Sequence, residues 1–156
     1  MKTFILPISI WLLACSGVVG TAGAREAALD APVRSNWFAS EQQAFWAACV
    51  YATGLGGSLV ETTGTPSMEP LIRGKTYAVI KKCPFDAVVE RDILVYRGRP
   101  DSSKVERVTM LHRAVLHDRK GWIMSGDNNR WSESWDRVTP ENYIGTVIAL
   151  FAFPNQ

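Results

Sequence analysis

From Ser58 to its end, the chain is a series of short segments rich in β-branched and aromatic residues. Six such segments are present: "SLVETTGT", "KTYAVIKK", "DILVYRG", "VERVTMLHRAVLH", "GWIMSG" and "YIGTVIALFAF". Turn-forming residues separate them, such as Arg73 with Gly74 and the stretch from Asp127 to Asn129. Short strands joined by tight turns usually pair with near neighbours in the sequence. The pattern therefore predicts a mainly β fold, a compact antiparallel domain over residues 58–156.

One helix is predicted ahead of this β region. Ser40 can cap a helix that runs to about Thr53, and Gln43 completes a capping-box pattern. The sequence "GLGG" then ends the helix. After Gln43 the segment is apolar nearly all round, which is typical of a core helix, although its aromatic residues would also suit a bilayer surface. The linker and this helix occupy residues 25–57.

The first 24 residues have the layout of an export signal. Lys2 precedes the apolar stretch "FILPISIWLLACSGVVG", and small residues from Ala22 to Ala24 form an A-x-A exit. This layout predicts a signal peptide or membrane anchor over residues 1–24. The domain is then expected at the cell membrane, on the extracytoplasmic side (periplasmic or exported). Because "LLAC" resembles a lipoprotein box around Cys15, removal, lipidation and retention of the leader all stay open.

Composition excludes some functions and leaves others open. The 156 residues suffice for one domain. The formal net charge is only +2 and no basic stripe is present, which argues against nucleic-acid binding. Cys49 and Cys83 could form a disulfide in an oxidising compartment or act as two buried thiols. Their spacing fits no metal site, and no metal or cofactor is predicted.

The stretch "TPSMEPLIRG" holds Ser67 between Pro66 and Pro70. A serine hydroxyl becomes a good nucleophile only when a neighbouring base takes its proton. Candidate bases are the only histidines, His112 and His117, which are five residues apart, or a lysine with a lowered pKa. Because residues five apart point to opposite faces of a strand, at most one of the histidines lies on the site face.

The hairpin formed by "LHRAVLH" and "WIMS" favours one of these histidines. If "DRKG" is its turn, His117 pairs with Trp122 and His112 falls opposite Asp127. A one-residue slip would place the last two on opposite faces. His112 is therefore favoured as the base, with Asp127 as its carboxylate. A turn-forming serine and a packed histidine remain the alternative explanation of these residues.

Four stretches of the chain resemble the type I signal peptidase family. "TGTPSMEPLIRG" resembles the S-M-x-P box, and "RDILVYRG" resembles the strand that follows it. "LHRAVLHD" is similar to the H-R-V box of the endoplasmic-reticulum and archaeal branch, and "SGDNNRWSESWDR" to the G-D-N-N/R box. The boxes are in family order and cover about residues 59–151. The resemblance implies a signal-peptidase-like β domain, a membrane-associated serine endopeptidase that needs no cofactor.

The resemblance also assigns roles to individual residues. Ser67 resembles the nucleophile and His112 the general base that replaces the lysine of common bacterial enzymes. Thr65 matches the side-chain oxyanion donor, with the Ser67 amide as the backbone donor. Met68 is expected as an apolar wall that binds substrate, with a plain core role as the alternative. For the acid, the resemblance points to Asp136, whereas the hairpin register selects Asp127, so both remain candidates.

The expected substrates are signal peptides or similar exported precursor polypeptides, cleaved after a small residue. Such a precursor would lie extended along an edge strand near "LVETTG", with small pockets that select alanine-like side chains. Two alternatives stay open. The first is a maturation peptidase dedicated to one precursor of the pilin or conjugation type, and the second is an inactive envelope domain that binds peptides. Hydrogen-bond reach between Ser67 and His112 discriminates catalysis from binding.

Overall fold

The computed structural model describes residues 33, 35–62, 65–100 and 106–154, and this part of the chain is mainly β. It contains one α-helix, α2 (Glu41–Leu55), and eight strands. The strands are β1 (Ser35–Trp37), β2 (Ser58–Glu61), β3 (Thr76–Lys81), β4 (Ile93–Gly98), β5 (Val108–Asp118), β6 (Gly121–Ser125), β7 (Glu133–Val138) and β8 (Tyr143–Ala152). Two short 3-10 turns are η1 (Pro66–Met68) and η2 (Phe85–Ala87).

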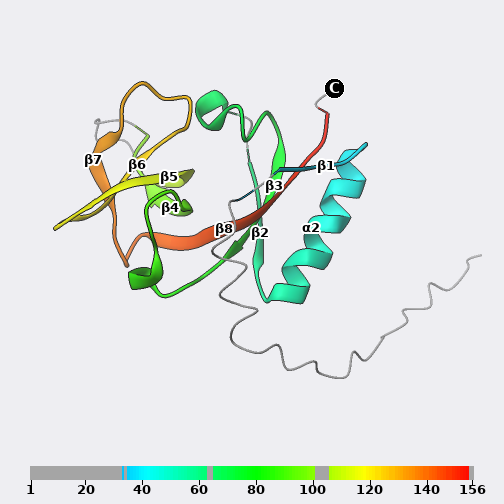
Figure 1. Ribbon diagram of the computed structural model, residues 1–156, viewed down its shortest axis with the longest axis horizontal. Coiled ribbons are helices and arrows are strands. Elements are labelled where there is room, and N and C mark those ends of the chain that lie inside the picture. Colours follow the sequence, from blue (N-terminus) through cyan, green and yellow to red (C-terminus); the bar gives the residue numbers. More distant parts are fainter. Residues whose placement is uncertain (1–32, 34, 63–64, 101–105, 155–156) are drawn as a thin grey trace, which may run out of the picture. The chain divides into compact units, whose positions relative to one another are not determined.

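All eight strands belong to one open sheet. Its order is β2-β3-β8-β4-β5-β6-β7, and β1 pairs with β8 outside this path. Only the β1–β8 pairing is parallel among the described strands, so the expectation of a mainly β, mostly antiparallel fold is confirmed. Figure 1 shows α2 beside the β2, β3 and β8 end of the sheet, with β4 to β7 gathered at the other end.

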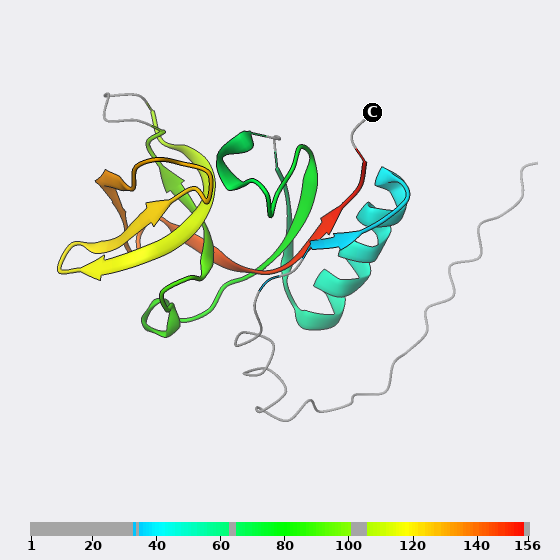
Figure 2. The same ribbon diagram turned by 45° about the horizontal axis from the view of Figure 1, so that its top comes forward.

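Strand β8 joins the two ends of the sheet. Near its start, Tyr143 and Gly145 pair with β4. Further along, residues from Thr146 to Ala152 pair with β3, and the last three also pair with β1. A ten-residue strand can serve both ends only because it follows the twist of the sheet, which the turned view makes visible (Figure 2).

The two faces of β3 bury different layers. Tyr77 and Val79 belong to the core cluster under α2. Ala78 and Ile80 belong to the cluster that contains Met68 of η1. Successive strand residues point to opposite faces. The helix and the segment that carries Ser67 are therefore packed on opposite faces of this strand.

The predicted helix is confirmed and extends slightly further than expected. The Ser40 side chain accepts a hydrogen bond from the Gln43 amide at 3.3 Å, so Ser40 caps the helix as predicted. The helix ends at Leu55, where Gly56 adopts the left-handed conformation with φ 62°. A glycine accepts this conformation without the steric cost of a Cβ atom.

The side of α2 that packs on the sheet is lined by small residues. Its buried positions are Ala44, Ala48 and Ala52, four residues apart. The large side chains point outward: Trp46 is 60% exposed and Val50 is 72% exposed. The helix is thus in close contact with the sheet through a stripe of alanines and leaves large apolar groups outside, unlike an ordinary core helix.

Two strands were not predicted. Strand β1 has only three residues and pairs with a strand more than a hundred positions away, so it lacks a local signal. Strand β7 lies in "ESWDRV", which alternates poorly and is not among the six segments expected to form strands. Its residues Trp135 and Asp136 face partners in other loops rather than a regular core.

The possible disulfide between Cys49 and Cys83 is not formed in the structure. Cys49 and Cys83 are both free thiols in this structure. Burial raises the pKa of the Cys83 thiol. The predicted leader over residues 1–24, with Cys15, lies outside the described residues. Within residues 33, 35–62, 65–100 and 106–154, no helix has the length and apolar character needed to cross a membrane.

The alanine stripe of α2 makes a stability prediction. Ala48 is fully buried against the sheet, so Ala48→Leu should lower the free energy of unfolding by about 1–3 kcal/mol through overpacking. Val50→Ala on the outer face should change it by less than about 0.5 kcal/mol. Urea denaturation of both variants measures the difference. Equal destabilisation by the two changes would contradict the packing described for α2.

Candidate functional site

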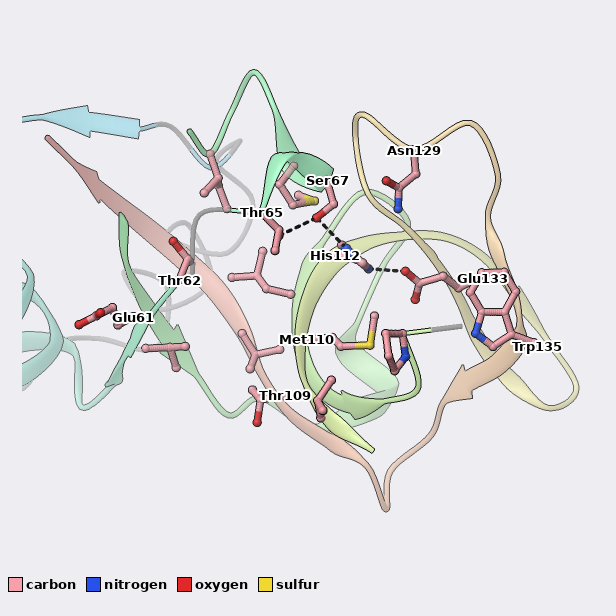
Figure 3. A pocket seen from close by; sticks show the side chains of 17 residues that line it. Glu61, Thr62, Thr65, Ser67, Thr109, Met110, His112, Asn129, Glu133 and Trp135 are labelled. Carbon is pink, nitrogen blue, oxygen red and sulfur yellow. Dashed lines mark hydrogen bonds and ion pairs between the residues drawn. The ribbon is translucent and has the colours of Figure 1, made fainter. Parts of the chain in front are cut away.

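Ser67 and His112 meet although they are 45 positions apart in the chain. Ser67 lies in η1, the turn that begins at Pro66 between β2 and β3. His112 lies in β5. The Ser67 Oγ atom is 3.1 Å from His112 Nε2, within hydrogen-bond reach (Figure 3). The structure therefore brings together the serine and the histidine that were singled out in the sequence.

The second ring nitrogen of His112 faces a buried carboxylate. His112 Nδ1 lies 2.5 Å from Glu133 Oε1, at the start of β7. The two residues are only 7% and 4% exposed. A carboxylate at this distance accepts the Nδ1–H proton, which leaves the Nε2 lone pair directed at the Ser67 hydroxyl. Ser67, His112 and Glu133 thus form one continuous chain of hydrogen bonds.

A tyrosine completes the surroundings of Glu133. Tyr96 of β4 donates from its hydroxyl to Glu133 Oε2 at 2.6 Å, and the same hydroxyl lies 3.3 Å from His112 Nδ1. Burial, followed by the charge of Glu133, raises the pKa of Tyr96. The phenol therefore stays protonated and acts as a donor to the carboxylate.

The predicted pairing of His112 with Asp127 is wrong. The turn end of the hairpin was predicted correctly, with His117 opposite Trp122. A bulge follows between Ala114 and Leu116, where the register shifts by one residue. Beyond it Arg113 lies opposite Ser125. A one-residue shift turns side chains to the other face, so Asp127 cannot lie beside His112.

Asp127 instead forms a two-pronged ion pair with Arg113. Arg113 Nε and Nη2 donate to its two carboxylate oxygens, each at 2.6 Å. Arg113 Nη1 also donates to the Arg91 carbonyl at 2.9 Å. Hydrogen bonding to Asp127 raises the pKa of the Arg113 guanidinium. Asp127 is thus an anchor for the loop that follows β6.

The other candidate acid, Asp136, is also engaged elsewhere. Its Oδ1 accepts from Arg107 Nη2 at 3.0 Å, and its Oδ2 accepts from the Arg99 amide at 3.1 Å. In the described part of the chain, the carboxylate that contacts His112 is Glu133. Sequence reasoning missed Glu133 because β7 was not recognised. It missed Tyr96 although a buried tyrosine calls for a partner for its hydroxyl.

The loop after β6 braces the segment that carries Ser67. The Asn128 amide donates to the Ser67 carbonyl at 2.8 Å, and Asn128 Nδ2 donates to the Pro66 carbonyl at 3.1 Å. Gly126 approaches so closely that a Cβ atom there would lie 2.5 Å from the Ser67 carbonyl oxygen. Only glycine fits this contact without displacing the backbone.

A pocket of about 510 Å³ opens beside the serine (Figure 3). Its walls are mostly apolar, and Ser67, Thr65 and His112 contribute polar atoms to it. Thr65 Oγ1 lies 3.3 Å from Ser67 Oγ. Met68 lines the pocket and is also buried in the core cluster below it.

Within the part of the chain that the structure describes, the pocket lies between two strands with unpaired edges. Val60 and Glu61 of the edge strand β2 line one side. Val108 to His112 of β5 line the other. These β5 residues pair with β4, whereas pairing with β6 begins only at Arg113. An extended chain placed here would find backbone partners on both sides.

Metal ligation has no candidate group in the described residues. Across residues 33, 35–62, 65–100 and 106–154, no set of three or more histidine, cysteine, aspartate or glutamate side chains is arranged to hold an ion.

Comparison of this chain with protein-family models, with curated proteins and with solved structures gives no match.

Proposed function

We propose that the protein is a membrane-associated serine endopeptidase of the signal-peptidase type, acting on exported precursors. The observation that carries the proposal is the hydrogen-bonded series Ser67–His112–Glu133, with contacts of 3.1 Å and 2.5 Å. A domain that only binds peptides has no need for such an alignment. The contact between hydroxyl and imidazole therefore favours catalysis over the binding alternative.

The residues act in a defined order in this proposal. Ser67 Oγ attacks the scissile carbonyl carbon while its proton passes to His112 Nε2. The tetrahedral intermediate then expels the amine, which takes the proton from Nε2, and an acyl-enzyme remains. Water repeats the sequence and frees Ser67. Glu133 stabilises the imidazolium formed in each half-reaction and replaces both aspartates as the acid of the site.

The oxyanion is assigned to donors beside the nucleophile. The Ser67 amide supplies the backbone donor and Thr65 Oγ1, 3.3 Å from Ser67 Oγ, the side-chain donor. Preorganised donors of this kind contribute about 3–4 kcal/mol to the transition state. The brace from Asn128 to the Pro66 and Ser67 carbonyls fixes this short segment, so that donor and nucleophile keep their relative positions.

The substrate is proposed to bind as an extended strand between β2 and the free part of β5. The pocket walls are mostly apolar there, and Ser67 lines the same pocket. This placement agrees with the edge-strand expectation for "LVETTG", because β2 has a single neighbour on its path through the sheet. Cleavage after a small residue and an extracytoplasmic location at the membrane belong to the same proposal.

The nucleophile is tested by Ser67→Ala. The change removes the attacking oxygen, so cleavage of a panel of signal-peptide substrates should fall by at least about 10³-fold. Product formation is followed by mass spectrometry, and a circular dichroism spectrum identical to wild type serves as the control for folding. Full activity in Ser67→Ala would exclude this serine as the nucleophile.

The two histidines provide a matched test of the base. His112→Ala should lower kcat by roughly 10³-fold or more, because Ser67 loses its proton acceptor. His117 is exposed and packs at a tilt against Trp122, with ring centroids 4.8 Å apart, so His117→Ala should leave kcat nearly unchanged. Steady-state kinetics on one substrate measures both. A larger loss in His117→Ala than in His112→Ala would overturn the choice of base.

Three carboxylates can be compared in the same assay. Glu133→Gln keeps the shape of the side chain but removes its charge, and should lower kcat by roughly 10²- to 10⁴-fold. Asp127→Asn and Asp136→Asn should act mainly on stability, each by about 1 kcal/mol or less, because their partners are surface arginines. If either aspartate variant loses more kcat than Glu133→Gln, Glu133 is not the acid.

A further inference from the structure

Tyr96 lies in β4, and its hydroxyl reaches the carboxylate of Glu133. In the β4–β5 pairing Leu94 lies opposite His112, and Tyr96 lies opposite Met110. Tyr96 and His112 are therefore diagonal neighbours on one face of the sheet, within reach of a long side chain. The ring of Tyr96 is packed in the core with Met124 and Val138, and only its hydroxyl is directed at Glu133.

The two oxygens of Glu133 have separate partners. Oε1 faces His112 Nδ1 at 2.5 Å, and Oε2 accepts from the Tyr96 hydroxyl at 2.6 Å. A glutamate has one more rotatable bond than an aspartate, so one contact leaves its carboxylate free to rotate. The second contact fixes the plane of the carboxylate, and with it the direction of Oε1.

We propose that Tyr96 is a positioning residue of the proposed catalytic site, which holds Glu133 in the orientation that directs His112 Nε2 at Ser67. This inference rests on the proposed function for its kinetic consequence, whereas the geometry behind it does not depend on catalysis. Tyr96 is not among the residues that line the pocket beside Ser67. It acts through Glu133, which in turn sets the tautomer and the ring orientation of His112.

The surroundings explain why a tyrosine is needed rather than a phenylalanine. Tyr96 and Glu133 are both nearly inaccessible to solvent, so water is poorly placed to replace a lost phenol donor. Without the Tyr96 hydroxyl, Glu133 Oε2 would be buried with no donor, and the carboxylate would rotate toward another one. The Nδ1–H of His112 already donates to the other oxygen, so rotation of the carboxylate would change the angle of that hydrogen bond.

The chain offers a matched control in Tyr143. Tyr143 is buried in the same core cluster as Tyr96, and its hydroxyl is hydrogen-bonded to Thr146 at 2.8 Å, away from the acid. Tyr96→Phe and Tyr143→Phe each remove one buried hydroxyl from that cluster. Both variants should lose stability, and Tyr96→Phe should lose more because its hydroxyl donates to a carboxylate. An effect on catalysis should be confined to Tyr96→Phe.

The kinetic test uses the full chain and one cleavable signal-peptide substrate. Tyr96→Phe should lower kcat by roughly 10- to 100-fold, the range expected for a hydrogen bond to a charged group, with KM unchanged. Tyr143→Phe should keep the wild-type kcat. Equal kcat values in the two variants, or a change confined to KM, would overturn the positioning role.

A double-mutant cycle tests whether Tyr96 acts through Glu133. In the Glu133→Gln background, Tyr96→Phe should cause little further loss of kcat, because the charge that it orients is already gone. If the losses from Tyr96→Phe and Glu133→Gln multiply as independent effects, Tyr96 acts by another route and the inference fails.

A spectroscopic test separates this inference from the proposed function. The Nδ1–H proton of His112 can be followed by NMR in protein labelled with ¹⁵N-histidine, whether or not any peptide is cleaved. Its resonance should move in Tyr96→Phe and stay in place in Tyr143→Phe. An inactive wild-type protein with this response would refute the protease proposal alone. An unchanged resonance in Tyr96→Phe would refute the role of Tyr96.

Discussion

The contact between Glu133 and His112 is the interaction on which the arrangement of the site depends. A carboxylate removed from water loses a large solvation free energy, and only well-placed partners offset it. Here both oxygens are engaged, one by His112 at 2.5 Å and one by Tyr96 at 2.6 Å. These partners belong to β5 and β4, whereas Glu133 begins β7. The sheet must therefore curl far enough for β7 to lie over β4.

Bulges make this curl possible. The register shifts in the β4–β8, β5–β6 and β6–β7 pairings all fall in the half of the sheet that surrounds the acid. Each extra residue bends its strand and increases the local twist. The bulge between Ala114 and Leu116 has a second effect, because it turns Arg113 toward Asp127 while His112 remains on the face of the acid. One inserted residue thus separates a structural ion pair from the proposed catalytic one.

Much of the fold and part of the site could be predicted from the sequence. The helix was predictable because its cap is local, three residues from Ser40 to Gln43. The pairing of His117 with Trp122 was predictable because a tight turn fixes the register next to it. Glu133 was not predictable as the partner of His112. The bulge in β5 changes which residues lie near His112, and β7, where Glu133 lies, has no clear strand pattern in the sequence. The alternation of side chains predicts which residues share a face only as far as the first bulge in a strand.

Glu133 differs from three aspartates of the domain in the kind of residue that its carboxylate contacts. Asp118, Asp127 and Asp136 are each bonded to an arginine: Arg137, Arg113 and Arg107. A guanidinium keeps its charge at every relevant pH, and Arg137 accordingly lowers the pKa of Asp118. Glu133 is bonded instead to an imidazole and a phenol. An arginine partner would already neutralise the carboxylate, so the charge of Glu133 is left for the imidazolium that forms when His112 takes a proton. The contact with a histidine in place of an arginine therefore distinguishes Glu133 from these aspartates.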